Sequence, residues 1–131
     1  MKKYDVNEII EQYERSGEKM YKATLEGDYR TNNREGAKLT RIFKSFEKDI
    51  DLAQKCIPEL IRSSNVVVRT KAAAYCLSLK FNVEEGEAVL KEIGDNKENG
   101  IFGFNARMTL AVWKKQGYLK MYPDQQIKME L

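Results

Sequence analysis

The stretch that decides the fold class is residues 57–77, which read IPELIRSSNVVVRTKAAAYCL. It predicts two helices joined by a short polar turn, the first over about 52–62 and the second over about 66–80. Asn65 stands where its side chain can cap the second helix. Pro58 removes a main-chain hydrogen bond from the first helix and is expected to kink it. Helices joined by a short connection pack as antiparallel neighbours, so the stretch predicts a helical hairpin.

A second copy of this pattern lies further along the chain. Residues 68–75 read VRTKAAAY and residues 106–113 read ARMTLAVW, so an arginine is followed by an aromatic side chain at the same spacing in both. Arg69 and Arg107 are 38 residues apart, a period typical of stacked helix pairs. Each pair leaves an apolar face uncovered and the next pair covers it. We therefore expect the two aromatic side chains at equivalent places in successive layers.

Helical periodicity also extends before this repeat. A first helix is expected over about 6–25, with Asp5 and Glu8 placed to form a capping box at its start. A second helix is expected over about 31–49. Its apolar residues fall on one side and its cations on the other, as is typical of a surface helix.

The C-terminal part of the chain predicts two further helices. Asn82 is expected to cap a fifth helix that ends near Gly94, and a sixth helix is expected over about 101–116. This sixth helix is apolar on most sides, which predicts burial in the middle of a packing layer. Pro123 and the weak periodicity after residue 117 predict a tail with little fixed structure.

The hairpin in residues 57–77 resembles a HEAT repeat, in which a proline lies in the first helix and Val-Arg opens the second. The second copy is degenerate, because it lacks the proline and has a longer loop. Across most of its length, the chain is similar to a family of small bacterial HEAT-like domains of unknown function. Members combine a long N-terminal hairpin, a Val-Arg repeat and a closing helix with Ala-Arg-Met-Thr-Leu near a tryptophan. Some relatives resemble immunity proteins that neutralise toxins of contact-dependent and other polymorphic toxin systems.

The resemblance implies an all-α fold, a HEAT-like α-α superhelix of about three stacked helical hairpins. The 131 residues suffice for one domain with a real core but not for two. The expected single domain, 1–131, comprises a long hairpin over 1–50, two HEAT-like helix pairs over 51–116 and a tail over 117–131.

Composition excludes several kinds of chemistry. The chain has no histidine, so an imidazole general base and a histidine metal ligand are both ruled out. Its two cysteines, Cys56 and Cys76, fit a reducing cytosol. The charged start has no apolar signal segment, and no apolar run approaches a membrane span. We therefore expect a cytoplasmic protein without metal ligands or a cofactor.

Charged residues recur along the first two expected helices. On the second helix they lie opposite the apolar side, where they form either a solvated face or a docking strip for an acidic partner or phosphates. The candidate partner-binding residues are Glu11, Glu14, Glu18, Arg34, Arg41, Lys44 and Lys48.

Other conspicuous residues are expected to serve structure. The resemblance implies that Arg69 and Arg107 tie adjacent layers through carboxylates or carbonyls. Pro58 belongs to the first repeat helix, and Trp113 is expected in the core. An acidic cluster over 84–87 suits the first turn of a helix better than acid–base catalysis. No catalytic, metal-binding or cofactor-binding residue is predicted.

Two functions of different classes remain open. The first is a non-catalytic protein-binding module, specifically an immunity protein with one protein partner, a toxin domain. The alternative is a HEAT-like nucleic-acid-binding or generic scaffold protein that uses the basic face of the second helix. Catalysis is the third and least supported function, and we expect neither a small-molecule substrate nor a membrane contact. The net charge of +3 weighs against an inhibitor of basic nucleases, which needs a local acidic patch.

Overall fold

The computed structural model describes residues 5–122, and in that range the chain is all-α with no strand. Its helices are α1 (Val6–Glu26), α2 (Tyr29–Lys48), α3 (Ile50–Leu60), α4 (Val66–Leu79), α5 (Val83–Asp95) and α6 (Gly100–Gln116), with the short 3-10 helix η1 (Lys97–Asn99) before α6. The predicted all-α class is confirmed. The expectation for the tail concerns residues 123–131, which lie outside the described residues.

Side-chain caps explain where three helices begin. Asn65 accepts hydrogen bonds from the main-chain amides of Val67 and Val68, so its predicted role is confirmed. Asp49 accepts from the amide of Leu52 at the start of α3. Asp28 accepts from the amide of Thr31, so α2 starts at Tyr29, two residues before the predicted start.

Two predicted caps are wrong. Asn82 adopts a left-handed conformation, with φ of 55°, and its side chain makes no capping hydrogen bond. A capping side chain needs the extended backbone that brings its oxygen over the first amides, which the left-handed conformation does not provide. Asp5 has an extended backbone, but its side chain makes no capping bond either, so the expected capping box with Glu8 is absent.

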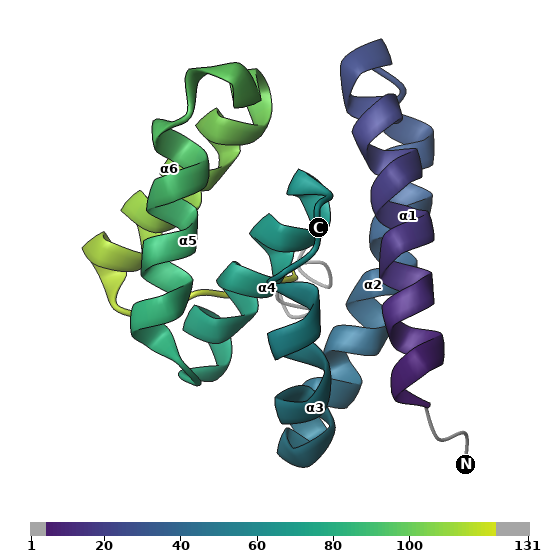
Figure 1. The fold of residues 1–131 in the computed structure, drawn as a ribbon, viewed down its shortest axis with the longest axis vertical. Coiled ribbons are helices and arrows are strands. Elements are labelled where there is room, and N and C mark those ends of the chain that lie inside the picture. Colours follow the sequence, from purple (N-terminus) through teal and green to yellow (C-terminus); the bar gives the residue numbers. More distant parts are fainter. Residues whose placement is uncertain (1–4, 123–131) are drawn as a thin grey trace, which may run out of the picture.

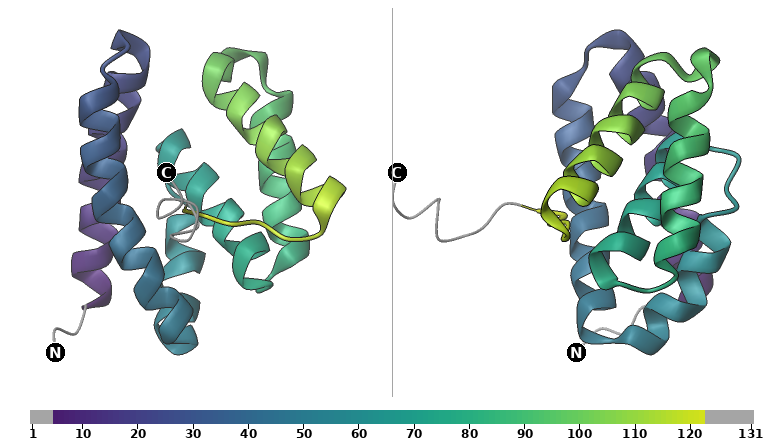
Figure 2. Two further views of the ribbon diagram at one scale, coloured as in Figure 1. Left: turned by 180° about the vertical axis from the view of Figure 1, so that it is seen from behind. Right: turned by 90° about the vertical axis from the view of Figure 1, so that its left-hand side faces the viewer.

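The helices form two long hairpins around a central helix. In Figure 1, α1 and α2 stand side by side on one side of the molecule, α5 and α6 stand on the other, and α3 and α4 lie between them. Helix α4 contacts α1, α3, α5 and α6. After α6, residues 117–122 cross back toward α2 (Figure 2), and the Leu119 carbonyl accepts a hydrogen bond of 2.8 Å from Ser78 on α4. We call residues 117–122 the return segment.

The core is built on α4. Its residues 72–77 are all buried, and the ring of Tyr75 contacts Tyr13 of α1 and both Phe43 and Phe46 of α2, with ring centroids 4.5–6.1 Å apart. The hydroxyls of Tyr13 and Tyr75 are 2.7 Å apart. Three consecutive alanines, 72–74, let the neighbouring helices approach α4 closely.

The prediction that the sixth helix is the buried central helix is wrong. On α6 only Phe102, Gly103 and Ala106 are buried. The physical reason is position in the packing: α4 has neighbours on opposite sides, whereas α6 contacts α4, α5 and η1. A helix that is apolar all round but packed on one side leaves an apolar face in solvent. That face is described with the candidate site below.

Candidate protein-binding surface

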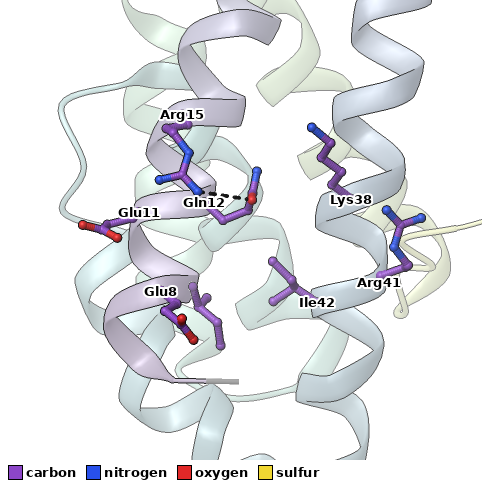
Figure 3. A pocket seen from close by; sticks show the side chains of 8 residues that line it. Glu8, Glu11, Gln12, Arg15, Lys38, Arg41 and Ile42 are labelled. Atoms are coloured by element: carbon purple, nitrogen blue, oxygen red, sulfur yellow. Dashed lines mark hydrogen bonds between the residues drawn. The ribbon is translucent and has the colours of Figure 1, made fainter. Parts of the chain in front are cut away.

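The charged candidates on α1 and α2 border two different hollows. The first is a groove of about 470 Å³ between α1 and α2, with Glu8 and Glu11 on one wall and Lys38 and Arg41 on the other. Figure 3 shows the side chain of Glu11 on α1 pointing away from Lys38 and Arg41 on α2. Within the described residues, no ion pair joins the two walls. Lys38 is nevertheless engaged, because its ammonium lies 3.1 Å from a carboxylate oxygen of Glu35 on its own helix.

A buried polar network lies behind this groove and joins the two helices. Gln12 donates to the Ser16 hydroxyl at 2.8 Å, and Ser16 donates to a carboxylate oxygen of Glu35 at 2.8 Å. The other oxygen of Glu35 accepts from Lys38 at 3.1 Å and lies 3.5 Å from Nε of Arg34. Ser16 and Glu35 are buried, with exposed fractions of 0% and 1%. We call these residues, Gln12, Ser16, Arg34, Glu35 and Lys38, the hairpin network.

The network keeps Glu35 ionised inside the protein. Burial alone raises the pKa of a carboxyl group. Hydrogen bonds from Ser16 and Lys38, and the charges of Lys38 and Lys19, outweigh that effect and hold the pKa of Glu35 below its ordinary value. A buried charge is tolerated only when it is paired and hydrogen-bonded, so the hairpin depends on these partners.

Sequence reasoning missed Glu35, although a signal for it exists. Glu35 lies four residues before the apolar Leu39, and Ser16 lies three residues after the buried Tyr13. Both positions are therefore in register with the apolar side of their helix. A serine and a glutamate at core positions of two adjacent helices indicate a buried pair, and only the packing shows that they meet.

The remaining charged candidates lie apart from the groove. Glu14 and Glu18 border a second hollow together with Ser64 and Asn65, in the turn before α4. The ammonium of Lys44 lies 4.7 Å from the ring centroid of Tyr122 in the return segment. Lys48 is exposed at the end of α2. The seven predicted partner-binding residues therefore do not form one patch.

A row of exposed apolar side chains lies on the outer side of α6. Four large side chains recur there at steps of three or four residues, which places them on one side of the helix. Each is 40–51% exposed. We call these residues, Ile101, Phe104, Met108 and Val112, the α6 stripe. Sequence periodicity showed these apolar positions but assigned them to the core.

The two repeated arginines make similar contacts. Nε of Arg69 donates to the carbonyl of Ile61, which caps the C-terminus of α3, and its Nη2 donates to Glu92 of α5 at 2.8 Å. Nη1 of Arg107 donates to the carbonyl of Gly94 in the last turn of α5 at 2.6 Å. Each guanidinium thus joins the two helices of its own pair, and Arg69 also reaches the next pair.

The other two residues expected to be structural lie at the ends of helices. Pro58 is half-buried in the last turn of α3, which ends two residues later. Trp113 is partly buried near the end of α6, and its indole Nε1 donates to Glu87 at 2.7 Å. Trp113 is more exposed than the buried Tyr75, since no further helix pair covers it in the part of the chain that the structure describes.

Both cysteines of the chain are buried. Burial raises the pKa of Cys56 and Cys76 to about 11, so neither thiol ionises appreciably near neutral pH. Neither cysteine is in a disulfide. Across residues 5–122, no three acidic or cysteine side chains gather as a metal-binding group. In the same range, no helix has the length and apolar character needed to cross a bilayer.

Comparison of the chain with protein-family models, with curated proteins and with solved structures gives no match. The resemblance to HEAT-like domains therefore stays a prediction from the sequence, and the function is argued from the surface itself.

Proposed function

We propose that this protein is a non-catalytic protein-binding module and that the α6 stripe is the centre of its binding surface. The observation that supports the proposal is the exposure of Phe104 and Met108, at 51% and 48%, on one side of α6. Single exposed apolar residues are ordinary on a protein surface, but a contiguous row of them marks an interaction site.

The position of the stripe in the fold supports the same proposal. In a HEAT-like stack, which remains part of the proposal, each helix pair covers the apolar face left by the pair before it. The α5–α6 pair covers α4 and presents the next such face to solvent. A rigid helix that offers an apolar row binds with little loss of conformational entropy.

The partner that we propose is a folded protein domain, specifically a toxin domain that this chain inhibits by covering it. The sequence resemblance to immunity proteins motivates this class of partner. Inhibition by covering requires no reactive group in the inhibitor. Around the stripe, Arg107, Lys114 and Lys115 are exposed, and such peripheral charges steer encounter and set specificity.

The test is co-expression with a candidate toxin domain, taken from the C-terminus of a secreted protein encoded beside this chain. We expect a stoichiometric complex by size-exclusion chromatography with light scattering, together with survival of the cells. The double substitution Phe104→Glu and Met108→Glu places two charges in the stripe and should abolish the complex. Because both side chains are half exposed, the variant should keep its helical circular dichroism.

The matched control is Ile50→Glu, which adds a charge at another exposed apolar residue, 46% exposed at the start of α3. This control should bind as the wild type does. Absence of a complex and of protection, with both proteins folded, contradicts the immunity function. If the stripe variant instead abolishes a dimer of the isolated chain, the stripe is a self-association surface and the proposal is wrong.

A further inference from the structure

The exposed side of α6 has the residue spacing of a coiled-coil seam. In such a seam, apolar side chains recur at alternating steps of three and four residues and pack between those of a facing helix. The residues of α6 that follow these steps are Ile101, Phe104, Met108 and Ala111, and all four are exposed. The three buried residues of α6 lie on the other side of the helix. The α6 stripe therefore presents a seam whose facing helix is absent from the described residues.

This seam is short, but the domain supports it. Residues 101–115 amount to two heptads, fewer than the three to four or so that a self-supporting coiled coil needs. Helix α6 does not depend on a coiled coil for its own folding, because it packs on α4 and α5. A second helix that lays its apolar side on such a preformed helix uses a common mode of protein recognition.

Cations border the seam, and α6 contains no aspartate or glutamate. Arg107 and Lys114 are seven residues apart and occupy equivalent positions along one edge of the seam. The Cζ atom of Arg107 lies 6.0 Å from the ring centroid of Phe104, which places this cation beside the apolar row. Lys115 follows Met108 by seven residues and so takes the next position of the seam itself. Within residues 5–122, none of these three exposed cations forms an ion pair.

The positions of these cations disfavour a second copy of the chain as the facing helix. In a parallel pair of α6 helices, the two Lys115 side chains would meet at the seam. In an antiparallel pair, Arg107 and Lys114 of one copy would face the same two residues of the other. Either arrangement brings like charges together, which costs binding free energy. Charge complementarity therefore selects a facing helix that is acidic.

We propose that the α6 stripe binds one amphipathic helix of the partner protein, with acidic residues beside its apolar row. This inference rests on the stripe being the protein-binding surface and names the element that the stripe receives. Carboxylates of the partner helix pair with Arg107 and Lys114, and a further carboxylate faces Lys115 and fixes the register. The other edge of the seam carries the uncharged Asn105 and Val112, so the acidic residues are needed along one edge only.

An anionic membrane is the other surface that suits an apolar row with cations. A helix bound to a membrane buries a wide apolar face. On α6, the uncharged polar Asn105 and the cationic Lys115 lie within the exposed side and narrow the apolar row to the width of a seam. The narrow row favours a protein helix as the occupant.

The test is an NMR titration of the ¹⁵N-labelled full chain with two matched helical peptides. Both peptides are about three heptads long, since shorter isolated helices are marginal in water. Both carry isoleucine and leucine along the apolar row, and the positions beside that row are all glutamate in one and all lysine in the other. Like charges keep each peptide from pairing with itself. We expect the glutamate peptide to bind at least about tenfold more tightly, to shift the amides of Phe104, Met108 and Lys115, and to lose this preference at high salt.

Two double variants separate a local charge effect from the net charge of the protein. Lys114→Glu with Lys115→Glu should reverse the preference, so that the lysine peptide binds more tightly. Both side chains are exposed, so the helical circular dichroism should be retained. Lys48→Glu with Lys55→Glu makes the same change in net charge at exposed positions of α2 and α3. This matched control should keep the preference of the wild type.

Several results would overturn the proposal. They are equal binding of the two peptides, tighter binding of the lysine peptide by the wild type, and absence of shifts on α6 with either peptide. An unchanged preference in the Lys114→Glu, Lys115→Glu variant contradicts it as well. Phosphatidylglycerol vesicles are the membrane probe, and vesicle binding that shifts the amides of α6 while the glutamate peptide shifts none would assign the stripe to a membrane surface.

These results can be told apart from failure of the proposed function. A toxin complex that Phe104→Glu with Met108→Glu abolishes, and that Lys114→Glu with Lys115→Glu leaves intact, supports the protein-binding proposal and overturns the acidic helix. A preference for the glutamate peptide without any toxin complex supports the acidic helix and contradicts the immunity function.

Discussion

The two long hairpins of this protein are held together by opposite means. In the α1–α2 hairpin, a buried carboxylate and a buried hydroxyl meet at the centre, and charged side chains line a groove on the outside. In the α5–α6 hairpin, side chains donate to main-chain carbonyls, glycines allow close packing, and apolar side chains of α6 also lie on the outside. The first hairpin pairs the carboxylate and the hydroxyl at its centre, whereas the second leaves four large apolar side chains of α6 exposed.

The comparison indicates that the polar contacts of the α1–α2 hairpin set how its helices pair, whereas the packing of the α5–α6 hairpin supports a surface for binding. A buried polar contact such as the hydrogen bond from Ser16 of α1 to Glu35 of α2 is weak evidence for stability, but it can fix which residues of the two helices face each other. In the α5–α6 hairpin, Gly94 lies against the side chain of Arg107, and Gly103 lies against the carbonyl of Ile93. Such close backbone packing places the α6 stripe on a rigid support.

The largest effect is expected at Glu35. Glu35→Ala removes the buried carboxylate and leaves the Ser16 hydroxyl without its acceptor and Lys38 without its counter-ion. Lys38 is 37% exposed and can be solvated, so the main costs are the unpaired buried hydroxyl, about 1–3 kcal/mol, and the cavity that the side chain leaves. We expect a loss of this size in the free energy of unfolding, measured by urea denaturation. Glu11→Ala, on the exposed side of α1, should change it by less than about 0.5 kcal/mol, and equal effects at the two sites would contradict the role of the hairpin network.

The same carboxylate predicts a dependence on pH. The pKa of Glu35 is lowered in the folded state, so the unfolded chain takes up a proton before the folded protein does as the pH falls. The stability that Glu35 contributes is therefore complete above the ordinary glutamate pKa of about 4.3 and is lost as the pH falls through the lower folded value. We expect the wild type to lose more stability than Glu35→Gln between about pH 5 and pH 3. Parallel pH profiles for the two proteins would contradict this prediction.

Alanine substitutions at two glycines are expected to change the stability of the protein in opposite directions. A Cβ at Gly86 of α5 would lie 2.7 Å from the carbonyl oxygen of Ala73 in α4, whereas at Gly36 of α2 it would meet only the Met20 methyl, at 3.7 Å. Gly86→Ala should therefore destabilise the protein by about 1–3 kcal/mol through overpacking. Gly36→Ala should stabilise it by about 0.5–1 kcal/mol, since alanine favours a helix. Thermal unfolding of both variants checks the signs.

Substitution of the two repeated arginines is expected to lower the stability by different amounts. Arg69 is the less exposed of the two and reaches both Ile61 and Glu92, so Arg69→Ala should cost about 1–3 kcal/mol. Arg107 is exposed and donates one hydrogen bond, to Gly94, so Arg107→Ala should cost about 0.5–1.5 kcal/mol. Urea denaturation of both variants gives the order. An Arg69→Ala protein that is as stable as the wild type but binds no partner would assign Arg69 to the binding surface.

Local signals predicted more of this structure than did signals that depend on neighbours. The glycines that end α1 and α6, the Asn65 cap and the helix over 66–80 follow from residues close in sequence, and the structure has them. The capping failure at Asn82 depends on one backbone angle that composition does not reveal. Sequence alone therefore predicts element types well and caps less well.

The candidate site was less predictable because it depends on what covers each helix. The periodicity of 101–116 is the same whether α6 is central or peripheral, and only the packing decides that α4 is the central helix. The charged candidates on α1 are separated for the same reason, since the turn before α4 packs against one side of α1 and α2 packs against another. Pairing of Ser16 with Glu35 likewise required the register of the two helices.

The smallest effect is expected for nucleic-acid binding by the cations of α2. Measuring this binding tests which hairpin carries the binding function. Arg34 lies beside Glu35, and Lys44 lies over the ring of Tyr122, so these two cations are already engaged within the protein. If Arg34, Arg41, Lys44 and Lys48 all contacted phosphates, affinity would fall by roughly two decades between about 50 and 200 mM salt. We expect weak binding of labelled single-stranded RNA or duplex DNA at low salt, measured by fluorescence anisotropy, and none near physiological ionic strength. Arg41→Gln should weaken that residual binding, while the double substitution in the α6 stripe should leave it unchanged. Tight binding at about 150 mM salt that Arg41→Gln abolishes would assign the function to the α1–α2 hairpin instead of α6, because such affinity requires most of these cations to release counter-ions together.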